Sequence, residues 1–334
     1  MTVSLQSPGR INKLQLKNRL VLAPMQQHKG TPAGHATDYH VEHYGRRAAD
    51  VGLVIIESTA VSQDGRLYQD DIGIYSDSHI KPLGKVVKAV HTRDARVFIQ
   101  LSHGGRKSHL LPGERLLSSS PIAFSDEYGL PFEAKNEQLE QLIGRYREAA
   151  LRSREAGFDG IELHAAHGYL LHQFLSPISN LRTDSYGGSP NRRLQFVLQV
   201  AIAVREAVGP DYPVQIRVSA SDYDPGGLIP LHIADIVKRL EPLLDAVHVS
   251  SGGITPLRPL DVYPGYQIPY AAVLKSETTL PVIAVGGIHQ RALAERVVAE
   301  QLADFVAIGR PMLDEPDFAG QLLGKQPLSA RSGS

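Results

Sequence analysis

The sequence predicts a single α/β domain built as a closed (β/α)8 barrel. Short apolar runs alternate with longer amphipathic segments along the 334 residues, which is typical of a parallel sheet covered by helices. Eight such units fit a closed barrel at this length. A doubly wound sheet would need a glycine fingerprint after its first strand, and "APMQQHKGTPAGHA" does not supply it. The expected strands are 19–24, 53–59, 96–102, 158–164, 213–219, 245–251, 281–287 and 304–310.

Helices are expected between these strands. Apolar residues recur at helical spacing from Glu140 to Glu155, and Asp38, Ser78 and Asn136 occupy positions where helix N-caps are expected. The expected helical segments are 38–50, 79–94, 136–156, 190–208, 230–241, 289–300 and 314–323.

Two connections are long for a compact barrel. Residues 103–135 follow the third strand and residues 176–190 follow the fourth, and both are rich in Ser, Pro and Gly. Long loops in a compact domain are more often functional lids than linkers, so we expect 103–135 to cap an active site. Residues 325–334 are expected to form a C-terminal tail. No composition break divides the chain, so 1–334 is interpreted as one domain.

Composition excludes several classes of protein. Basic and acidic residues number 35 each, so no basic face for nucleic acid is indicated. No apolar run approaches a membrane span, and the first residues lack the apolar core of a signal peptide. These observations predict a cytoplasmic protein. Cysteine is absent, which excludes disulfides, thiolate metal sites, iron–sulfur clusters and cysteine nucleophiles.

Glycines end the seventh and eighth expected strands. Gly286 and Gly287 follow one strand, and Gly309 and Arg310 follow the next. Such ends present backbone N–H groups to a phosphate, and an arginine adds forked donors. The alternative is that these glycines only permit tight turns. Their occurrence on successive strands, with an arginine, favours a phosphate site.

Arg217 lies inside the fifth expected strand and should point into the barrel mouth. A buried arginine is rare unless it is paired, so structural pairing with Glu162 or Asp222 is one interpretation. The other is a ligand that carries delocalised negative charge. Gln100, on the third strand, offers an amide donor and acceptor toward the same space.

Three polar rings follow the fourth expected strand, in "ELHAAHGY". His164, His167 and Tyr169 suggest paired donors for an oxygen atom together with a proton source. A metal site that adds His172 is disfavoured, because no acidic cluster joins these rings. Together with a phosphate site and Arg217, they suggest a large phosphorylated cofactor with a polar heterocycle, and flavin mononucleotide (FMN) fits that description.

The chain resembles the Old Yellow Enzyme family of FMN-dependent ene-reductases, in particular its bacterial thermophilic-like branch. The resemblance extends from "LKNRLVLAPM" to "FVAIGRPMLDEP" and is most specific in "AGFDGIELHAAHGYLLHQFLSPISNLRTDSYGGSPNRR", "QLSHGGRK" and "IRVSASDY". It implies a (β/α)8 barrel that binds FMN, takes hydride from NADPH or NADH, and reduces activated alkenes such as enones by a ping-pong mechanism.

The resemblance also implies roles for individual residues. His164 and His167 would bind the substrate carbonyl oxygen, and Tyr169 would protonate the α-carbon. Arg217 would lie near the N1–C2=O region of the flavin, and Gln100 at its pyrimidine edge. The full cofactor-binding set expected from the strand ends and the resemblance is Ala23, Pro24, Met25, Gln26, Ala60, Gln100, Arg217, Gly252, Gly286, Gly287, Gly309 and Arg310.

The sequence departs from this branch at three places. Gln26 stands where a cysteine is usual, and His28 stands where a tyrosine usually shapes the substrate pocket. The arginine–aromatic tail that often enters a neighbouring subunit's site is reduced here to Arg331 without an aromatic residue after it. A homodimer or homotetramer is still the expected assembly.

Two other functions remain open at this stage. The chain could be a flavin reductase or NAD(P)H oxidase without alkene specificity, or a phosphate-binding barrel enzyme without flavin. The sequence does not choose between NADPH and NADH, since it contains no dedicated nucleotide-binding motif.

Overall fold

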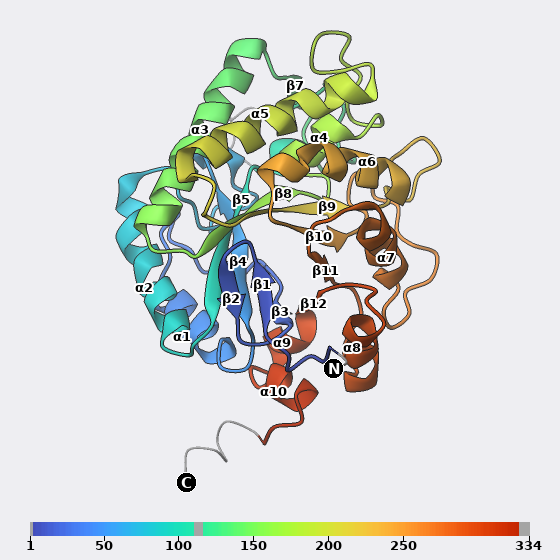
Figure 1. Cartoon of the computed structure of the whole chain (residues 1–334). Helices are drawn as coiled ribbons and strands as arrows, with labels where there is room; N and C mark the ends of the chain where they lie inside the picture. The colour runs from blue at the N-terminus through green and yellow to red at the C-terminus, as the bar shows by residue number, and fades with distance from the viewer. Residues whose placement is uncertain (1–2, 110–115, 327–334) are drawn as a thin grey trace.

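The computed structural model describes residues 3–109 and 116–326. At its centre is a closed barrel of parallel strands surrounded by helices (Figure 1). The strands follow one another around the barrel in sequence order, and the last pairs with the first through Val306 and Leu20. The predicted fold class is thus confirmed. The barrel strands are β3 (Leu20–Leu22), β4 (Leu53–Ala60), β5 (Arg96–Ser102), β8 (Gly160–Ala165), β9 (Val214–Ser219), β10 (Ala246–Ser250), β11 (Val282–Ala284) and β12 (Phe305–Ile308).

The helices on the outside of the barrel largely match the predicted segments. The last predicted segment, 314–323, contains α10 and only the final residue of α9, and Pro316, which has no N–H to continue a helix, lies between these two helices. Three further helices, α4, α7 and α9, were not among the predicted segments. The helices are α1 (Asp38–Arg47), α2 (Ile80–His91), α3 (Asn136–Glu155), α4 (Leu170–Leu175), α5 (Pro190–Val208), α6 (Pro230–Leu240), α7 (Ile268–Glu277), α8 (Arg291–Ala299), α9 (Arg310–Asp314) and α10 (Phe318–Leu322).

The three predicted N-caps are wrong by one or more positions. Thr37 and Lys135 precede α1 and α3, so Asp38 and Asn136 are the first helical residues. Ser78 lies inside a short 3-10 turn before α2 and donates its backbone N–H to Ser76. Acidic and amide side chains are also common in a first helical turn, which explains the displacement.

One end of the barrel is closed by an N-terminal hairpin, β1 (Gly9–Ile11) and β2 (Leu14–Leu16). Ile11 and Leu16 join an apolar cluster with inward-facing strand residues such as Phe98 and Phe305. A second, larger cluster fills the space between the strands and the helices. Because the barrel interior is packed, a ligand of the barrel is expected at the end where the strands terminate.

The two predicted long loops pack against each other. The loop after β5 contains a small parallel pair, β6 (Leu117–Ser118) and β7 (Phe132–Glu133). Ser119 donates to the carbonyl of Ser179 at 2.7 Å, and Arg182 donates to the carbonyl of Ala134 at 2.6 Å. Residues 110–115 of this loop lie outside the described residues, as do 327–334 of the predicted tail with Arg331.

Within residues 3–109 and 116–326, no helix combines the length and the apolar character that crossing a membrane requires.

Candidate active site

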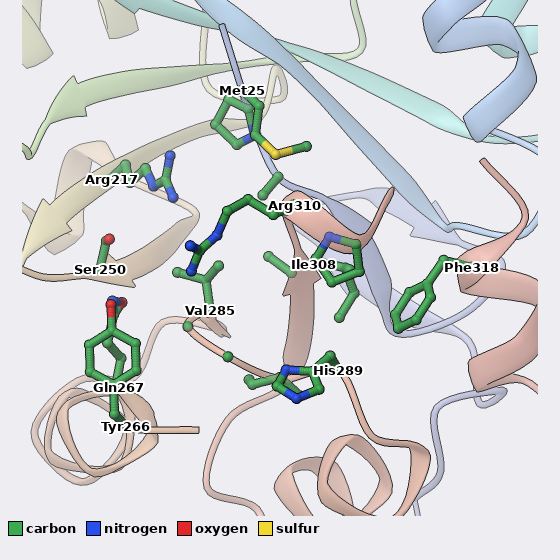
Figure 2. A pocket seen from close by; sticks show the side chains of 18 of the residues that line it. Met25, Arg217, Ser250, Tyr266, Gln267, Val285, His289, Ile308, Arg310 and Phe318 are labelled. Carbon is green, nitrogen blue, oxygen red and sulfur yellow. The ribbon is translucent and has the colours of Figure 1, made fainter. Parts of the chain in front are cut away.

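A cavity of about 730 Å³ opens at the carboxyl ends of β3 and β9 to β12. Figure 2 shows Met25, Arg217 and Arg310 extending into it from different strands. This volume is in the range of cofactor and small-ligand pockets. The lining includes eight residues of the predicted cofactor set: Ala23, Pro24, Met25, Arg217, Gly286, Gly287, Gly309 and Arg310.

The glycines after β11 and β12 lie along one wall of this cavity. Gly286 and Gly287 have φ of +112° and +67°, a region that residues with a side chain rarely adopt. A Cβ on Gly286 would approach the Gln267 side chain to 2.8 Å. Arg310 begins α9, and no described residue forms an ion pair with its guanidinium. This wall therefore offers glycine backbone and a cation that forms no ion pair with a described residue.

Arg217 lies on β9 and is only 7% exposed. Its Nε has no hydrogen-bond partner among the described residues. The two carboxylates considered as structural partners are engaged elsewhere: Glu162 with Gln100 and His248, and Asp222 with His172. Arg217 therefore lines the cavity with a buried Nε that has no partner among the described residues, while the charge of Glu162 partly offsets the lowering of its pKa by burial.

Four residues of the predicted cofactor set do not line this cavity. Gln100 donates to Glu162 at 2.7 Å inside the barrel, and Ala60 ends β4 with its N–H bonded to Ile72. Gly252, with φ +73°, follows β10. The fourth residue, Gln26, is partly buried, and its Nε2 has no partner in the described structure.

The three rings predicted to bind substrate come together at the end of β8. The His164 ring centroid is 5.1 Å from that of His167 and 4.8 Å from that of Tyr169, both edge-on. Nδ1 of His164 accepts the backbone N–H of Ala166 at 3.3 Å. Nε2 of His167 lies 2.8 Å from Oγ of Ser250, which itself lines the cavity.

The surroundings hold all three rings in their neutral forms. Burial, and then the nearby Arg217, lowers the pKa of His164 and of His167 well below the usual histidine value. Burial raises the pKa of Tyr169, and the carboxylate of Asp71 adds to this effect. Near pH 7 the site therefore contains two uncharged imidazoles and a protonated phenol.

His167 has an unusual backbone conformation, with φ of +57°. Its carbonyl accepts Nζ of Lys107 at 2.9 Å, and the same amine donates to the carbonyl of Gly253 at 3.1 Å. Burial lowers the pKa of Lys107 to about 8. A Cβ on Gly168 would lie 2.0 Å from the Gly253 carbonyl oxygen. Lys107 and the two glycines thus hold the loop after β8 against the loop after β10.

Sequence reasoning gave Lys107 no role, although it lies in the "QLSHGGRK" segment. Tyr266, Gln267 and Phe318 also line the cavity without having been predicted. They come from the loop before α7 and from α10, where spacing carries no signal. His28, predicted to bind substrate, lies outside this cavity on the loop after β3, with its ring 4.8 Å from Tyr68.

The barrel thus combines a cavity that is lined by Arg217 and Arg310 with a pair of neutral histidines at the end of β8. The sequence matches the family model of the NADH:flavin oxidoreductase / NADH oxidase family over residues 4–328. It is 43% identical to an NADPH dehydrogenase of Geobacillus thermodenitrificans over 319 residues, which are 95% of this chain and 92% of the relative.

Solved structures agree with this match. A morphinone reductase superposes with a TM-score of 0.85 at 28% identity, covering 98% of this chain and 91% of the reductase, and this enzyme is also known in complex with tetrahydroNAD. A 2-naphthoyl-CoA reductase in complex with 2-naphthoyl-CoA superposes with a TM-score of 0.91 at 25% identity; the match covers 97% of this chain but only 52% of that longer reductase.

The chain belongs to the NADH:flavin oxidoreductase / NADH oxidase family, which confirms the resemblance to the Old Yellow Enzymes. It is an NAD(P)H-dependent FMN oxidoreductase.

Proposed function

We propose that the chain is an ene-reductase that reduces the activated C=C bond of α,β-unsaturated carbonyl compounds with hydride from NAD(P)H. The observation that carries this proposal is the group formed by His164, His167 and Tyr169. Two neutral imidazoles and a protonated phenol at one strand end are suited to bind a carbonyl oxygen and to deliver a proton.

The cavity residues fit FMN. Arg310 and the glycine-bearing ends of β11 and β12 would hold its phosphate, and Arg217, whose Nε is unpaired, would face the electron-rich edge of the ring. Ala23, Pro24 and Met25 would pack on the ring. When bound, FMN supplies hydride transfer from NAD(P)H to the alkene. Gln26, Ala60, Gln100 and Gly252 remain proposed neighbours of the ring.

The two histidines would orient and polarise the substrate carbonyl. Since Nδ1 of His164 accepts a backbone N–H, its proton lies on Nε2 and is free to be donated. If Ser250 donates its hydroxyl proton to Nε2 of His167, the proton of that ring lies on Nδ1. Each ring then offers one N–H, and two donors stabilise the negative charge that develops on the oxygen.

Tyr169 would hold the proton that the α-carbon receives. Because burial and Asp71 raise its pKa, the hydroxyl stays protonated through the neutral range and can act as a general acid. We further propose that nicotinamide and substrate occupy the same space in turn. His28 would contribute to the mouth of that space. We also expect the protein to be located in the cytoplasm and to form a homodimer or homotetramer.

The experiment is a product assay. The FMN-loaded enzyme is incubated without oxygen with cyclohexenone and NADPH or NADH, and cyclohexanone is measured by gas chromatography. Loss of one such donor typically costs about 10²–10³ in rate. The rate of cyclohexanone formation should therefore fall by that factor in His164→Ala and in His167→Ala. His232→Ala, an exposed histidine on α6, is the matched control and should match the wild type.

NAD(P)H oxidation without cyclohexanone formation would show a flavin reductase and refute the proposal. Unchanged cyclohexanone formation in both histidine variants would refute the role of the pair while leaving alkene reduction in place.

A further inference from the structure

A polar cluster outside the cavity joins the loops after β3 and β4. Nδ1 of His28 lies 3.1 Å from Oδ1 of Asp70 and 3.8 Å from Oδ1 of Asp71. One potential ligand atom from each of these three side chains lies within 4.8 Å of the other two. An imidazole nitrogen and two carboxylate oxygens are ligands that zinc-type divalent cations accept.

Ion pairs of His28 with Asp70 and Asp71 would explain the cluster, but they leave Oδ1 of Asp71 without a hydrogen bond. The Asp71 side chain is only 2% exposed. Its Oδ2 accepts the backbone N–H groups of Leu67 at 2.9 Å and Tyr68 at 3.0 Å, so this oxygen holds the turn together. Its Oδ1 has no hydrogen-bond partner in the described structure. A buried polar atom without a partner is costly and rare.

The side chain of Gln26 lies beside Asp71 and is the protein group to weigh as a partner for its carboxylate. Burial raises the pKa of Asp71 to about 6. The amide of Gln26 is close enough to favour the charged carboxylate as a hydrogen-bond donor, but it makes no contact of normal hydrogen-bond geometry with Oδ1, and Nε2 of Gln26 has no such partner among the described residues. The free oxygen faces the side where His28 and Asp70 lie.

Backbone contacts hold the two loops in place. Gly30 donates its N–H to the carbonyl of Asp70 at 2.8 Å, and a Cβ on Gly30 would lie 2.7 Å from that oxygen. Nη1 of Arg66 donates to the carbonyls of Pro32 and Gln69, both at 2.8 Å. The three ligand-bearing side chains are therefore brought together by the fold, which favours a preorganised site.

We propose that His28, Asp70 and Asp71 form a binding site for one divalent cation of the zinc type beside the active-site mouth. Bond lengths of about 2.0–2.2 Å in a tetrahedral site place ligand atoms roughly 3.3–3.5 Å apart. The distances from Nδ1 of His28, 3.1 and 3.8 Å, bracket that spacing. The nitrogen ligand favours Zn²⁺ over Mg²⁺ or Ca²⁺, which take oxygen ligands.

The test is isothermal titration calorimetry of the FMN-loaded enzyme with Zn²⁺ after treatment with a chelator. The wild type should bind one equivalent, and Mg²⁺ should bind far more weakly. Loss of a residue that only supports a metal ligand already costs 10–100-fold in affinity. His28→Ala and Asp70→Asn, which remove ligands, should therefore each weaken Zn²⁺ binding by at least about 100-fold.

His91→Ala is the matched control. His91 is also an exposed histidine beside a carboxylate, with Nε2 2.7 Å from Oδ2 of Asp159, but no second carboxylate joins that pair among the described residues. This variant should bind Zn²⁺ like the wild type.

Asp71→Asn tests the buried oxygen, because an asparagine still provides one acceptor to the turn. It should also weaken Zn²⁺ binding, with flavin content and circular dichroism as checks on folding. If it does not fold, His28→Ala and Asp70→Asn decide the question. No saturable Zn²⁺ binding by the wild type, or binding unchanged in both of those variants, would overturn the proposal.

Discussion

Tyr169 is the residue whose proposed role depends most on its surroundings. An unperturbed tyrosine has a pKa near 10, and burial together with Asp71 raises the pKa of Tyr169 further. Lys107 lies 5.4 Å from the centre of its ring. The hydroxyl therefore keeps its proton across the neutral and mildly alkaline range, as a proton donor to carbon requires.

Replacing this hydroxyl separates the two halves of the catalytic cycle. General acid catalysis is typically worth 10²–10⁴-fold, so Tyr169→Phe should slow flavin reoxidation by cyclohexenone by about that factor. The rate of flavin reduction by NADPH should stay close to that of the wild type. Flavin reoxidation by a nitroalkene should slow less than reoxidation by cyclohexenone, because the anion formed from the nitroalkene can be protonated in water. Stopped-flow absorbance measures each half. Slowed reduction with intact reoxidation would show that Tyr169 positions nicotinamide instead.

Among the secondary-structure elements, helix α4 is held in place by a buried polar contact between His172 and Asp222. Nδ1 of His172 accepts the N–H of Gly168 at 3.0 Å, and its Nε2 lies 2.9 Å from Oδ1 of Asp222. The other Asp222 oxygen accepts from Ser176 and from the N–H of Leu228, both at 2.7 Å. Asp222 therefore ties both ends of α4 to the loop after β9 and supports the turn that carries Tyr169.

Asp222→Asn should destabilise the protein in a pH-dependent way. Burial alone would raise the pKa of Asp222, but His172 and the hydrogen bonds bring it below the ordinary 3.8. A carboxylate with a lowered folded-state pKa stabilises the protein above its unfolded pKa, and this contribution is lost as pH falls through the folded value. The variant should therefore lose roughly 2 kcal/mol at pH 7, the usual value for hydrogen bonds to a charged group.

Urea unfolding followed by circular dichroism measures this loss, and the gap between wild type and variant should shrink below about pH 4. Asp211→Asn, which removes an exposed pair with Lys13, is the control and should cost less than about 1 kcal/mol. A gap that stays constant from pH 7 to pH 3 would show that the charge of Asp222 does not matter.

For the whole molecule, the sequence predicted the barrel because every barrel strand is an apolar run between polar segments. Helix α4 was missed because all of its side chains are buried, so it shows no alternation between apolar and polar faces. The short hairpin β1–β2 was missed because its three-residue strands carry little periodicity. Short elements of this kind are defined by tertiary contacts.

The residues of the candidate site also fall into those that the sequence predicted and those that it did not. Residues at strand ends, such as Arg217 and Arg310, were predicted to face one space because parallel strands end at the same edge of a barrel. Lys107 and Asp71 lie in loops, where spacing does not reveal which side chains meet. Gln100 also shows a limit of strand-end reasoning, since its amide nitrogen bonds to Glu162 inside the barrel.

In the proposed function, the cavity lined by Arg217 and Arg310 and the adjoining group of His164, His167 and Tyr169 act as one active site, which takes hydride from NAD(P)H and passes it to an enone. The most direct measurement is the visible spectrum of the purified protein during anaerobic addition of NADPH and then cyclohexenone. We expect a flavin absorbance that is bleached by NADPH and restored by one equivalent of cyclohexenone. A colourless protein, or a bleached flavin that oxygen restores but cyclohexenone does not, would contradict it.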